Sequence, residues 1–400
     1  MYKVAYILHT SRPMDGSSKA FLSILEGVIG KGVQPMVVIP EKNGIYDQLI
    51  QLGVDTKVID HRASLYPPTD TLKDCLLLLP RLIGRIWLNN KAVKQLTAAL
   101  SQFQPDIVHT NTSVINIGYI ASRRLNIPHI WHLREYVDPD YHFYMSRRRY
   151  VQQFTTERSH TICITKDVQK HHKLSGWKNS CVIYDGVLPK EKRAWQETKK
   201  RYSLYAGRLF QTKGIEDLID AYAKYISSMG VTHEKEIIPL WIAGESTTEE
   251  YRRHLEEKVK RYQIENYIRF LGQRKDILQL MQEAYVTVVP ALQEGFGFIT
   301  AEAMFSGCLV IGKNNSGTKE QLDNGVERTG SEIGLRYETE EELIKILTTI
   351  SMETLEKYYP MMKAAQKVVS YLYSTESCVE QVVELYRSII SPKQLESSAG

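Results

Sequence analysis

Cysteine is scarce in this chain of 400 residues, and its spacing follows no pattern. No Cys-x-x-Cys pair occurs, which argues against a cysteine-based zinc site and against a disulfide framework. We therefore expect reduced core cysteines in a cytosolic protein. The five residues are Cys75, Cys163, Cys181, Cys308 and Cys378, most of them within apolar runs.

Long apolar runs are also lacking. No stretch approaches the roughly 20 residues that are needed to cross a bilayer. The apolar start of the chain leads at once into polar residues 10–15, which predicts a first β-strand and not a signal peptide. A hydrophobic fraction of 43% and a charged fraction of 24% are ordinary for a soluble globular protein, and the length predicts two domains.

Charge is distributed unevenly along the chain. Residues 1–190 hold 24 Lys and Arg against 15 Asp and Glu, whereas the remainder holds 27 against 31. A basic first half suggests contact with something anionic. A solvated basic face without a partner is the alternative.

Apolar, β-rich runs alternate with helical patterns over residues 2–185. Alternation of this kind predicts an α/β fold, with a parallel sheet covered on both faces and ligands at the carboxyl ends of its strands. The expected strands are Val4–Leu8, Pro35–Ile39, Val54–Ile59, Asp106–His109, His129–Leu133, Thr161–Thr165 and Cys181–Tyr184, and the expected helices include Ser18–Lys31, Val93–Phe103 and Asn116–Leu125.

The stretch from Glu294 to Glu302 reads Glu-Gly-Phe-Gly-Phe-Ile-Thr-Ala-Glu. It follows the strand-like run Tyr285–Pro290 and opens a helix-like segment, Phe298–Ser306. Gly295 and Gly297 allow positive φ and expose N–H groups at the helix start, where a phosphate or sugar oxygen can bind. The two carboxylates could reach a polyhydroxylated ligand, although a solvated helix face is the more usual explanation from the residues alone.

A pair of cations surrounds a second strand-to-helix loop. Arg208 follows an apolar strand, and Lys213 precedes the helix Ile215–Ile226, with Gly207 and Gly214 beside them. Arg by its fork and Lys as a point charge can clamp both phosphates of a diphosphate. Ordinary surface cations are the alternative.

The motif Glu294-Gly295-Phe296-Gly297 with Glu302-Ala303-Met304-Phe305-Ser306-Gly307 resembles the hallmark of the retaining nucleotide-sugar glycosyltransferases of family GT4. The Arg208 to Lys213 loop resembles the family's second signature. The resemblance covers nearly the whole chain and implies the GT-B architecture, in which two Rossmann-like doubly wound domains face a cleft.

The resemblance also implies roles for single residues. Glu294 would bind hydroxyls of the donor sugar, Glu302 the ribose hydroxyls, and Arg208 and Lys213 the diphosphate. His132, at a strand end, would line the sugar site facing the acceptor, although a lone histidine there is more often structural. The remaining implied contacts are N–H donors at Gly295, Phe296, Gly297, Gly317 and Thr318, backbone contacts to the base at Gly272, Gln273 and Arg274, and a diphosphate and acceptor loop at Gly16 and Ser17.

Two positions depart from the family pattern. Gly16-Ser17 stands where the family has Gly-Gly, so the loop could equally be a simple N-capped turn. Asp185 in Tyr184-Asp185-Gly186-Val187 replaces the usual Asn. That segment is expected to close a first domain of residues 1–187, followed by a linker at 188–200 and a nucleotide-sugar-binding domain at 201–375. The last helix, about 376–390, would cross back onto the first domain.

Lys73–Asn90 combines leucines and Trp87 with Arg81 and Arg85. Together with Arg147-Arg148-Arg149 and their aromatic neighbours it could rest on an anionic membrane, but we expect its leucines in the core of the first domain. Asp138-Pro139-Asp140 has the acid-x-acid form of manganese-dependent transferases, and equally that of a plain turn.

The resemblance therefore implies a metal-independent, retaining glycosyltransferase, which we expect to act in surface polysaccharide synthesis. The expected donor is a nucleotide diphosphate sugar, with UDP first, and the expected acceptor is a saccharide or a polyprenyl-diphosphate-linked glycan. No cofactor and no nucleic-acid partner are expected, and the expected location is cytoplasmic, with peripheral contact to the inner face of the membrane. The alternatives are a nucleotide-sugar epimerase of GT-B architecture and a non-catalytic glycan- or nucleotide-binding protein.

Overall fold

The computed structural model describes residues 2–12, 16–65, 71–137 and 147–390. They form two compact units, each described below by itself. Unit 1 comprises Met1–Gly186 and Thr375–Gly400, and unit 2 comprises Val187–Ser374. The expected acid-x-acid turn at 138–140 and the aromatic neighbours at 141, 143 and 144 lie outside the described residues.

Unit 1 is built on a parallel sheet of seven strands in the order β3-β2-β1-β4-β5-β6-β7. Its central strands are buried along their whole length, as expected for a sheet covered on both faces. The strands are β1 (Tyr2–Ile7), β2 (Val33–Ile39), β3 (Asp55–Val58), β4 (Ile107–Thr110), β5 (His129–Leu133), β6 (Ser159–Cys163) and β7 (Ser180–Val182).

Helices from both ends of the chain pack together in unit 1. In α15 (Thr375–Ile390), Val379, Val382 and Val383 are buried in the same core as residues of α1 (Gly16–Gly30). A Cβ on Gly27 would lie 2.5 Å from a Val379 methyl group, so this helix contact needs glycine. The other helices of the unit are α2 (Tyr46–Gln51), α3 (Leu72–Phe103), α4 (Ile117–Arg124), α6 (Arg147–Phe154) and α7 (Lys166–His171).

Unit 2 repeats the same strand order with six parallel strands, β10-β9-β8-β11-β12-β13. The strands are β8 (Lys200–Ala206), β9 (Leu240–Ala243), β10 (Ile268–Gly272), β11 (Ala284–Val289), β12 (Leu309–Lys313) and β13 (Leu335–Tyr337). The helices are α8 (Ile215–Met229), α9 (Glu249–Arg261), α10 (Ile277–Glu283), α11 (Phe298–Phe305), α12 (Ser316–Thr329), α13 (Glu340–Met352) and α14 (Tyr359–Leu372), and four 3₁₀ turns are η1 (Lys190–Lys192), η2 (Gln211–Lys213), η3 (Val231–Glu236) and η4 (Leu355–Tyr358).

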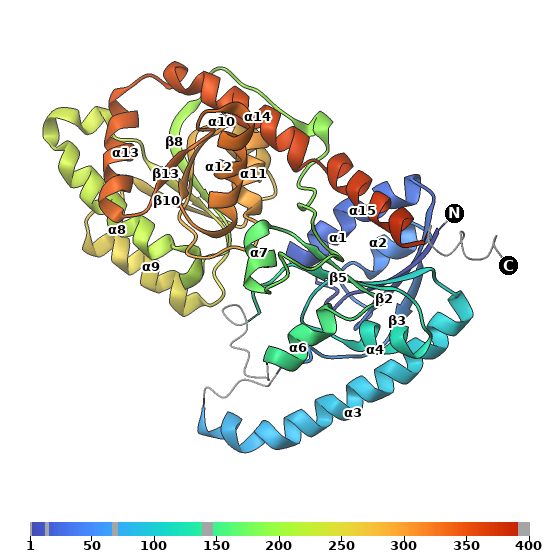
Figure 1. Cartoon of the computed structure of the whole chain (residues 1–400). Helices are drawn as coiled ribbons and strands as arrows, with labels where there is room; N and C mark the ends of the chain where they lie inside the picture. Colours follow the sequence, from blue (N-terminus) through green and yellow to red (C-terminus); the bar gives the residue numbers. More distant parts are fainter. Residues whose placement is uncertain (1, 13–15, 66–70, 138–146, 391–400) are drawn as a thin grey trace. The chain divides into compact units, whose positions relative to one another are not determined.

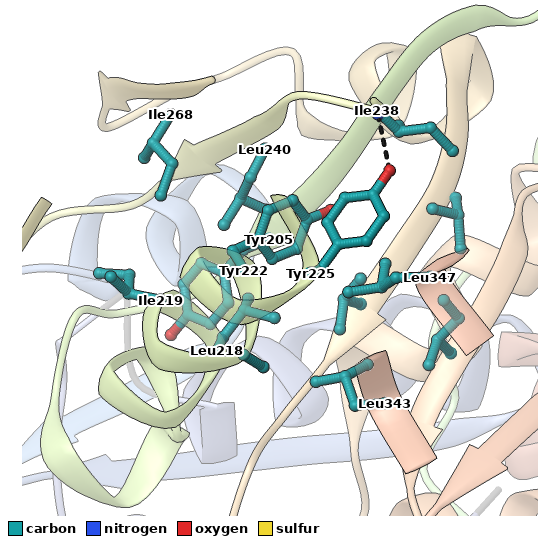
Figure 2. Packing of buried hydrophobic residues seen from close by; sticks show 14 of the residues in the cluster. Tyr205, Leu218, Ile219, Tyr222, Tyr225, Ile238, Leu240, Ile268, Leu343 and Leu347 are labelled. Atoms are coloured by element: carbon teal, nitrogen blue, oxygen red, sulfur yellow. Dashed lines mark hydrogen bonds between the residues drawn. The ribbon is translucent and has the colours of Figure 1, made fainter. Parts of the chain in front are cut away.

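Aromatic side chains of α8 fill the core of unit 2 (Figure 2). Tyr222 and Tyr225 are packed edge to face, in the same cluster as the sheet residue Leu240 and the α13 residue Leu347. The buried Tyr225 hydroxyl accepts a hydrogen bond of 2.9 Å from the Ile238 N–H, which satisfies its polar end. This core fixes α8 on the sheet and so fixes the loop that precedes it.

The expected linker at 188–200 is part of the structure of unit 2. Leu188 forms a β-bridge with Ser374, and the Ala194 N–H donates to the Phe305 carbonyl over 3.1 Å. Gln366 donates in turn to the Ala194 carbonyl over 2.5 Å. The segment is therefore held by side-chain and backbone hydrogen bonds, although its charged composition resembles that of a free linker.

The leucine-rich segment of α3 differs from expectation. We expected the leucines of Lys73–Asn90 in the core, but Leu76 and Leu79 are exposed, as are Ile83, Ile86 and the preceding Leu72. Only the second half of the helix is buried, through residues such as Val93 and Leu96. The expectation was wrong because the apolar run indicates a helix without indicating whether another element covers its face. Cys75, on the same face, is exposed as well.

Both sheets reverse their strand order at one point. In unit 1 the reversal lies between β1 and β4, and in unit 2 between β8 and β11. Loops leaving the carboxyl ends of two such strands diverge to opposite faces of the sheet and leave a crevice where ligands bind. In unit 2 these are the loops that carry Arg208, Lys213 and Glu294.

Candidate functional site

The two loops at the reversal point of unit 2 are joined by an ion pair. Lys213 Nζ, at the end of the loop after β8, lies 2.6 Å from Glu294 Oε1, in the loop after β11. The Leu292 N–H donates to the Thr212 carbonyl over 3.0 Å and joins the loops a second time. The structure thus brings together the lysine of one predicted signature and the first glutamate of the other.

Close backbone packing sets the position of Lys213. Gly214, the next residue, has φ +68°, and a Cβ there would lie 2.0 Å from the Pro290 carbonyl oxygen. Only glycine fits this left-handed position so close to another backbone. Gly214 also precedes α8, so the lysine stands directly before a helix start.

Only one oxygen of the Glu294 carboxylate has a hydrogen-bond partner among the described residues. Its side chain is 14% exposed, and Oε1 is bound by Lys213. Oε2 is buried and has no hydrogen-bond partner among the described residues. An unpaired buried carboxylate oxygen is costly, so a ligand hydroxyl that donates to it would be held firmly. Burial and, next, the Glu294 charge raise the pKa of the neighbouring Tyr205 well above its ordinary value.

The turn after Glu294 is locked by α12. Gln321 Nε2 donates to the carbonyls of Phe296, over 2.7 Å, and Gly297, over 3.0 Å. Gly297 has φ +88° and precedes α11, as the strand-to-helix turn predicts. A Cβ on Gly317 would lie 2.2 Å from the Phe296 carbonyl oxygen, so α12 begins in direct contact with this turn.

Polar groups at the start of α12 that were expected to face a ligand have partners within the protein. We expected the Gly317 N–H to face a diphosphate, but it donates to the Glu294 carbonyl over 3.0 Å. The Thr318 side chain is buried, and its hydroxyl lies 2.9 Å from that of Thr300. Gly317 therefore positions the Glu294 turn in the structure, and the predicted contact of Thr318 with a ligand stays a prediction.

The other predicted residues of unit 2 lie at the carboxyl edge of its sheet or on the helix that follows. Arg208 follows β8 and is exposed, and its guanidinium makes no ion pair within the described part of the chain. Glu302 is buried on α11. Gly272 ends β10 with φ +64°, and its carbonyl accepts from the Gly244 N–H over 2.9 Å. Gln273 follows, and the Arg274 guanidinium binds both carboxylate oxygens of Asp276.

His132 lies on β5 in unit 1 and has no exposed surface. Its Nδ1 is 3.2 Å from His109 Nε2 and 3.3 Å from Arg134 Nη2. His109 Nδ1 is 2.6 Å from the hydroxyl of Tyr386, on α15. Arg134 forms a buried ion pair with Asp185, the residue that departs from the family pattern. His132 is thus the centre of a buried polar network, and its predicted role at the sugar stays a prediction.

The network fixes which nitrogen of His132 carries the proton. Burial first, and then the charge of Arg134, lower the pKa of His132 well below 6.5, so the ring is neutral near pH 7. Because the Arg134 guanidinium can only donate, Nδ1 must accept and the proton lies on Nε2. Nε2 is buried, 4.0 Å from Asp185 Oδ1, and without a hydrogen-bond partner among the described residues.

The start of α1 is connected to this network. Asn111, directly after β4, donates to the Ser17 carbonyl over 3.0 Å and accepts from Arg134 over 3.1 Å. Gly16 opens the helix, and the buried Ser18 hydroxyl has no partner among the described residues. The structure therefore joins Ser17 and His132, both predicted from the family pattern, through Asn111 and Arg134.

Sequence reasoning missed the side chains that hold the site together. In unit 2 these are Gln321 and Asn315, whose Nδ2 donates to the Leu292 carbonyl over 2.9 Å. In unit 1 they are Asn111, Arg134 and Asp185. Arg134 and Asn111 directly follow buried strands, and that position was the available signal.

A metal site is not formed within the described residues. No group of three or more His, Cys, Asp or Glu side chains is close enough to hold an ion in that part of the chain. Within the same residues no helix has the length and apolar character to cross a membrane.

Comparison with known proteins adds independent findings. Residues 16–191 match the family model described as Glycosyltransferase Family 4, and residues 189–366 match the model described as Glycosyl transferases group 1. An uncharacterised glycosyltransferase of Methanocaldococcus jannaschii is 24% identical over 291 residues, 71% of this chain and 76% of that protein. A glycogen synthase of Mycobacterium tuberculosis is 31% identical over 124 residues, 30% of this chain and 28% of that protein.

Solved structures share this fold over nearly the whole chain. Anabaena HepE in complex with UDP superposes with a TM-score of 0.75 at 21% identity, over 96% of this chain and 100% of that one. Its complex with UDP-glucose gives 0.73 at 20% identity, over 97% and 100%. At this identity the likeness shows the fold, which is that of GT-B glycosyltransferases.

Fold and family models together define the class of protein: the chain is a glycosyltransferase with two Rossmann-like parallel-sheet domains. It belongs to the GT4-type family, group 1 of the glycosyl transferases, as the Glu294 and Arg208 motifs indicated.

Proposed function

We propose that this enzyme is a retaining glycosyltransferase that moves one sugar from a nucleotide diphosphate sugar to a saccharide or polyprenyl-diphosphate-linked acceptor. Its place is surface polysaccharide synthesis, in the cytoplasm at the inner face of the cell membrane. The observation that carries the proposal is the Lys213–Glu294 ion pair at the strand reversal of unit 2. A cation and a carboxylate side by side suit a ligand that joins a phosphate to a sugar.

The donor is held by charge and by hydroxyl recognition. Arg208 and Lys213 bind the diphosphate, whose negative charge grows as the glycosidic bond breaks. Glu294 accepts hydrogen bonds from sugar hydroxyls through the unpartnered Oε2, and Glu302 binds the ribose. The backbone at Gly272, Gln273 and Arg274 contacts the base. UDP is the nucleotide we propose, in keeping with the UDP complexes of HepE.

The reaction needs no metal in this scheme. The bond from the anomeric carbon to the diphosphate oxygen breaks, and the bonding electrons leave with the diphosphate. The acceptor oxygen attacks the same face of the sugar and forms the new bond, and its proton passes to the departing phosphate. Lys213 and Arg208 stabilise that leaving charge, an effect worth about 3 to 4 kcal/mol per donor in known oxyanion sites.

Transfer from radiolabelled UDP-sugars to a saccharide acceptor tests the proposal. Lys213→Ala is expected to reduce turnover at least about a hundredfold. The matched control is Lys224→Ala, which breaks an exposed ion pair between α8 and Glu340 outside the site. Undiminished transfer by Lys213→Ala would contradict the assignment.

The same assays separate the alternatives. An epimerase would convert the free UDP-sugar without any acceptor. A non-catalytic binding protein would show a thermal shift with UDP but no turnover with any of the UDP-sugars tested.

A further inference from the structure

The first half of α3 exposes a row of large apolar side chains, here called the α3 stripe. It consists of Leu72, Leu76, Leu79, Ile83, Ile86 and Trp87, which are between 54% and 87% exposed. Their spacing of three and four residues places them on one face of the helix. Exposed apolar residues elsewhere in the described chain, such as Val231 and Tyr371, do not form such a row.

The rest of α3 anchors the stripe. The buried residues of the helix all follow it: Ala92, Val93, Leu96 and Leu100. The helix packs against α4, while the stripe covers about 22 Å of its length at 1.5 Å per residue. Figure 1 shows α3 as the long helix of unit 1. The fold therefore holds one continuous helix, with Pro80 inside it, whose first half exposes its apolar face.

The charges of α3 indicate what covers this face. The helix has five cations, Lys73, Arg81, Arg85, Lys91 and Lys94, and one carboxylate, Asp74. Asp74 is already paired with Arg81 over 2.6 Å. Lys73 and Lys91 are exposed at the two ends of the stripe, and Lys91 Nζ lies 5.8 Å from the centre of the Trp87 ring. Apolar residues and tryptophan between flanking lysines are typical of a helix that lies in a lipid headgroup layer.

We propose that the α3 stripe is the surface by which this enzyme lies on an anionic lipid bilayer, with the helix parallel to the membrane and its leucines below the headgroups. The proposal builds on the membrane location proposed above but is independent of the transfer chemistry. A second copy of the chain fits the face less well, because pairing two such helices would bring ten cations together with two carboxylates. An anionic lipid surface complements them.

Vesicle co-sedimentation with the full chain tests this. Wild type is expected to bind vesicles of phosphatidylcholine with phosphatidylglycerol more tightly than vesicles of phosphatidylcholine alone. Leu76→Asp combined with Leu79→Asp is expected to weaken binding at least about tenfold. Val231→Asp, at a 91% exposed site of unit 2, is the matched control and is expected to bind as wild type. Because all three side chains are exposed, urea unfolding is expected to be unchanged.

Trp87 supplies a second readout. Its fluorescence is expected to shift to shorter wavelength on anionic vesicles, and the shift is expected to fall in Trp87→Phe. Equal vesicle binding by the double variant would overturn the proposal, and so would a wild-type dimer that the double variant abolishes. If UDP shifts the melting temperature but vesicles are not bound, the membrane proposal is contradicted and the proposed function is not. Vesicle binding without a UDP shift or transfer would instead contradict the proposed function.

Discussion

Lys213 and Glu294 are 81 positions apart in the chain, yet Nζ and Oε1 are 2.6 Å apart. The pair joins the loops after β8 and β11, the two strands between which the sheet of unit 2 reverses its order. The lysine proposed to bind the diphosphate is paired with the carboxylate proposed to bind the sugar. In the proposed scheme, the diphosphate and the Glu294 carboxylate therefore compete for the charge of Lys213.

This competition predicts opposite effects of two substitutions on UDP affinity. Glu294→Gln releases Lys213, so UDP is expected to bind about two- to fivefold more tightly, the range for a partly exposed ion pair. Lys213→Ala removes the cation and is expected to weaken UDP about tenfold or more. Isothermal titration measures both. Weaker UDP binding by Glu294→Gln would show that the carboxylate does not compete for the lysine.

Two Gly→Ala substitutions separate the stability cost of close packing from that of backbone strain. Gly214→Ala would force a Cβ to within 2.0 Å of the Pro290 carbonyl, at φ +68°. Gly330→Ala has a matching left-handed backbone, with φ +72° and ψ 6° against φ +68° and ψ 19° at Gly214, but a Cβ there meets nothing within 4 Å. We expect a loss of about 1 to 2 kcal/mol in unfolding free energy at position 330 and a larger loss at 214. Urea denaturation gives both values, and equal losses would contradict the packing argument.

The buried ion pair of unit 1 makes Asp185→Asn informative, since asparagine is usual there in the family. The change leaves the Arg134 charge buried without its partner, and we expect a loss of about 3 to 5 kcal/mol in unfolding free energy. The double variant Arg134→Met with Asp185→Asn lacks both charges. We expect it to be less destabilised than Asp185→Asn alone. A double variant that loses the sum of the two single effects would show that the residues do not interact.

The buried histidines predict a loss of stability in acid. Burial, and next Arg134, lower the pKa of His109 to about 3, against 6.5 for an ordinary histidine. Below pH 6.5 the unfolded chain takes up a proton that the folded chain does not, so stability is full above pH 6.5 and falls as pH drops towards 3. At pH 5 the proton taken up by unfolded His109 lowers the unfolding free energy by about 2 kcal/mol.

Unfolding at pH 7 and pH 5 measures this dependence. His109→Gln does not titrate, so its loss between the two pH values is expected to be about 2 kcal/mol smaller than in wild type. The variant is also expected to be less stable at pH 7, because Tyr386 and His132 lose their contact. An unchanged pH dependence would show that His109 titrates normally in the fold.

Metal removal tests the expectation that sugar transfer needs no metal ion. Transfer in excess chelator is expected to equal transfer in added manganese or magnesium, since Arg208 and Lys213 are proposed to stabilise the diphosphate. Activity that is lost in chelator and restored by a divalent ion would contradict the metal-independent scheme.

The sequence located most strands and helix starts because their signals are local. The run Tyr285–Pro290 became β11 (Ala284–Val289), and the segment Phe298–Ser306 became α11 (Phe298–Phe305). The family and the parallel-sheet class were also predicted and are confirmed. Roles of single residues at a ligand stay predictions.

Contacts between distant elements could not be predicted. Gln321 reaches from α12 to the turn before α11, and nothing in its local sequence indicates this. Gly317 was expected to donate to a ligand, but its N–H is used by the Glu294 carbonyl. Leu76 and Leu79 were expected in the core, because an apolar pattern indicates a face without indicating what covers it.

Tyr386 lies near the end of the described chain, and its hydroxyl contacts His109 in the polar centre of unit 1. Unit 2 is one continuous segment, Val187–Ser374, whereas unit 1 needs α15. During synthesis, unit 2 can therefore complete its core first, although most of unit 1 precedes it in the chain. Until α15 emerges, α1 lacks the helix that its apolar residues pack against, so unit 1 exposes apolar surface while unit 2 folds.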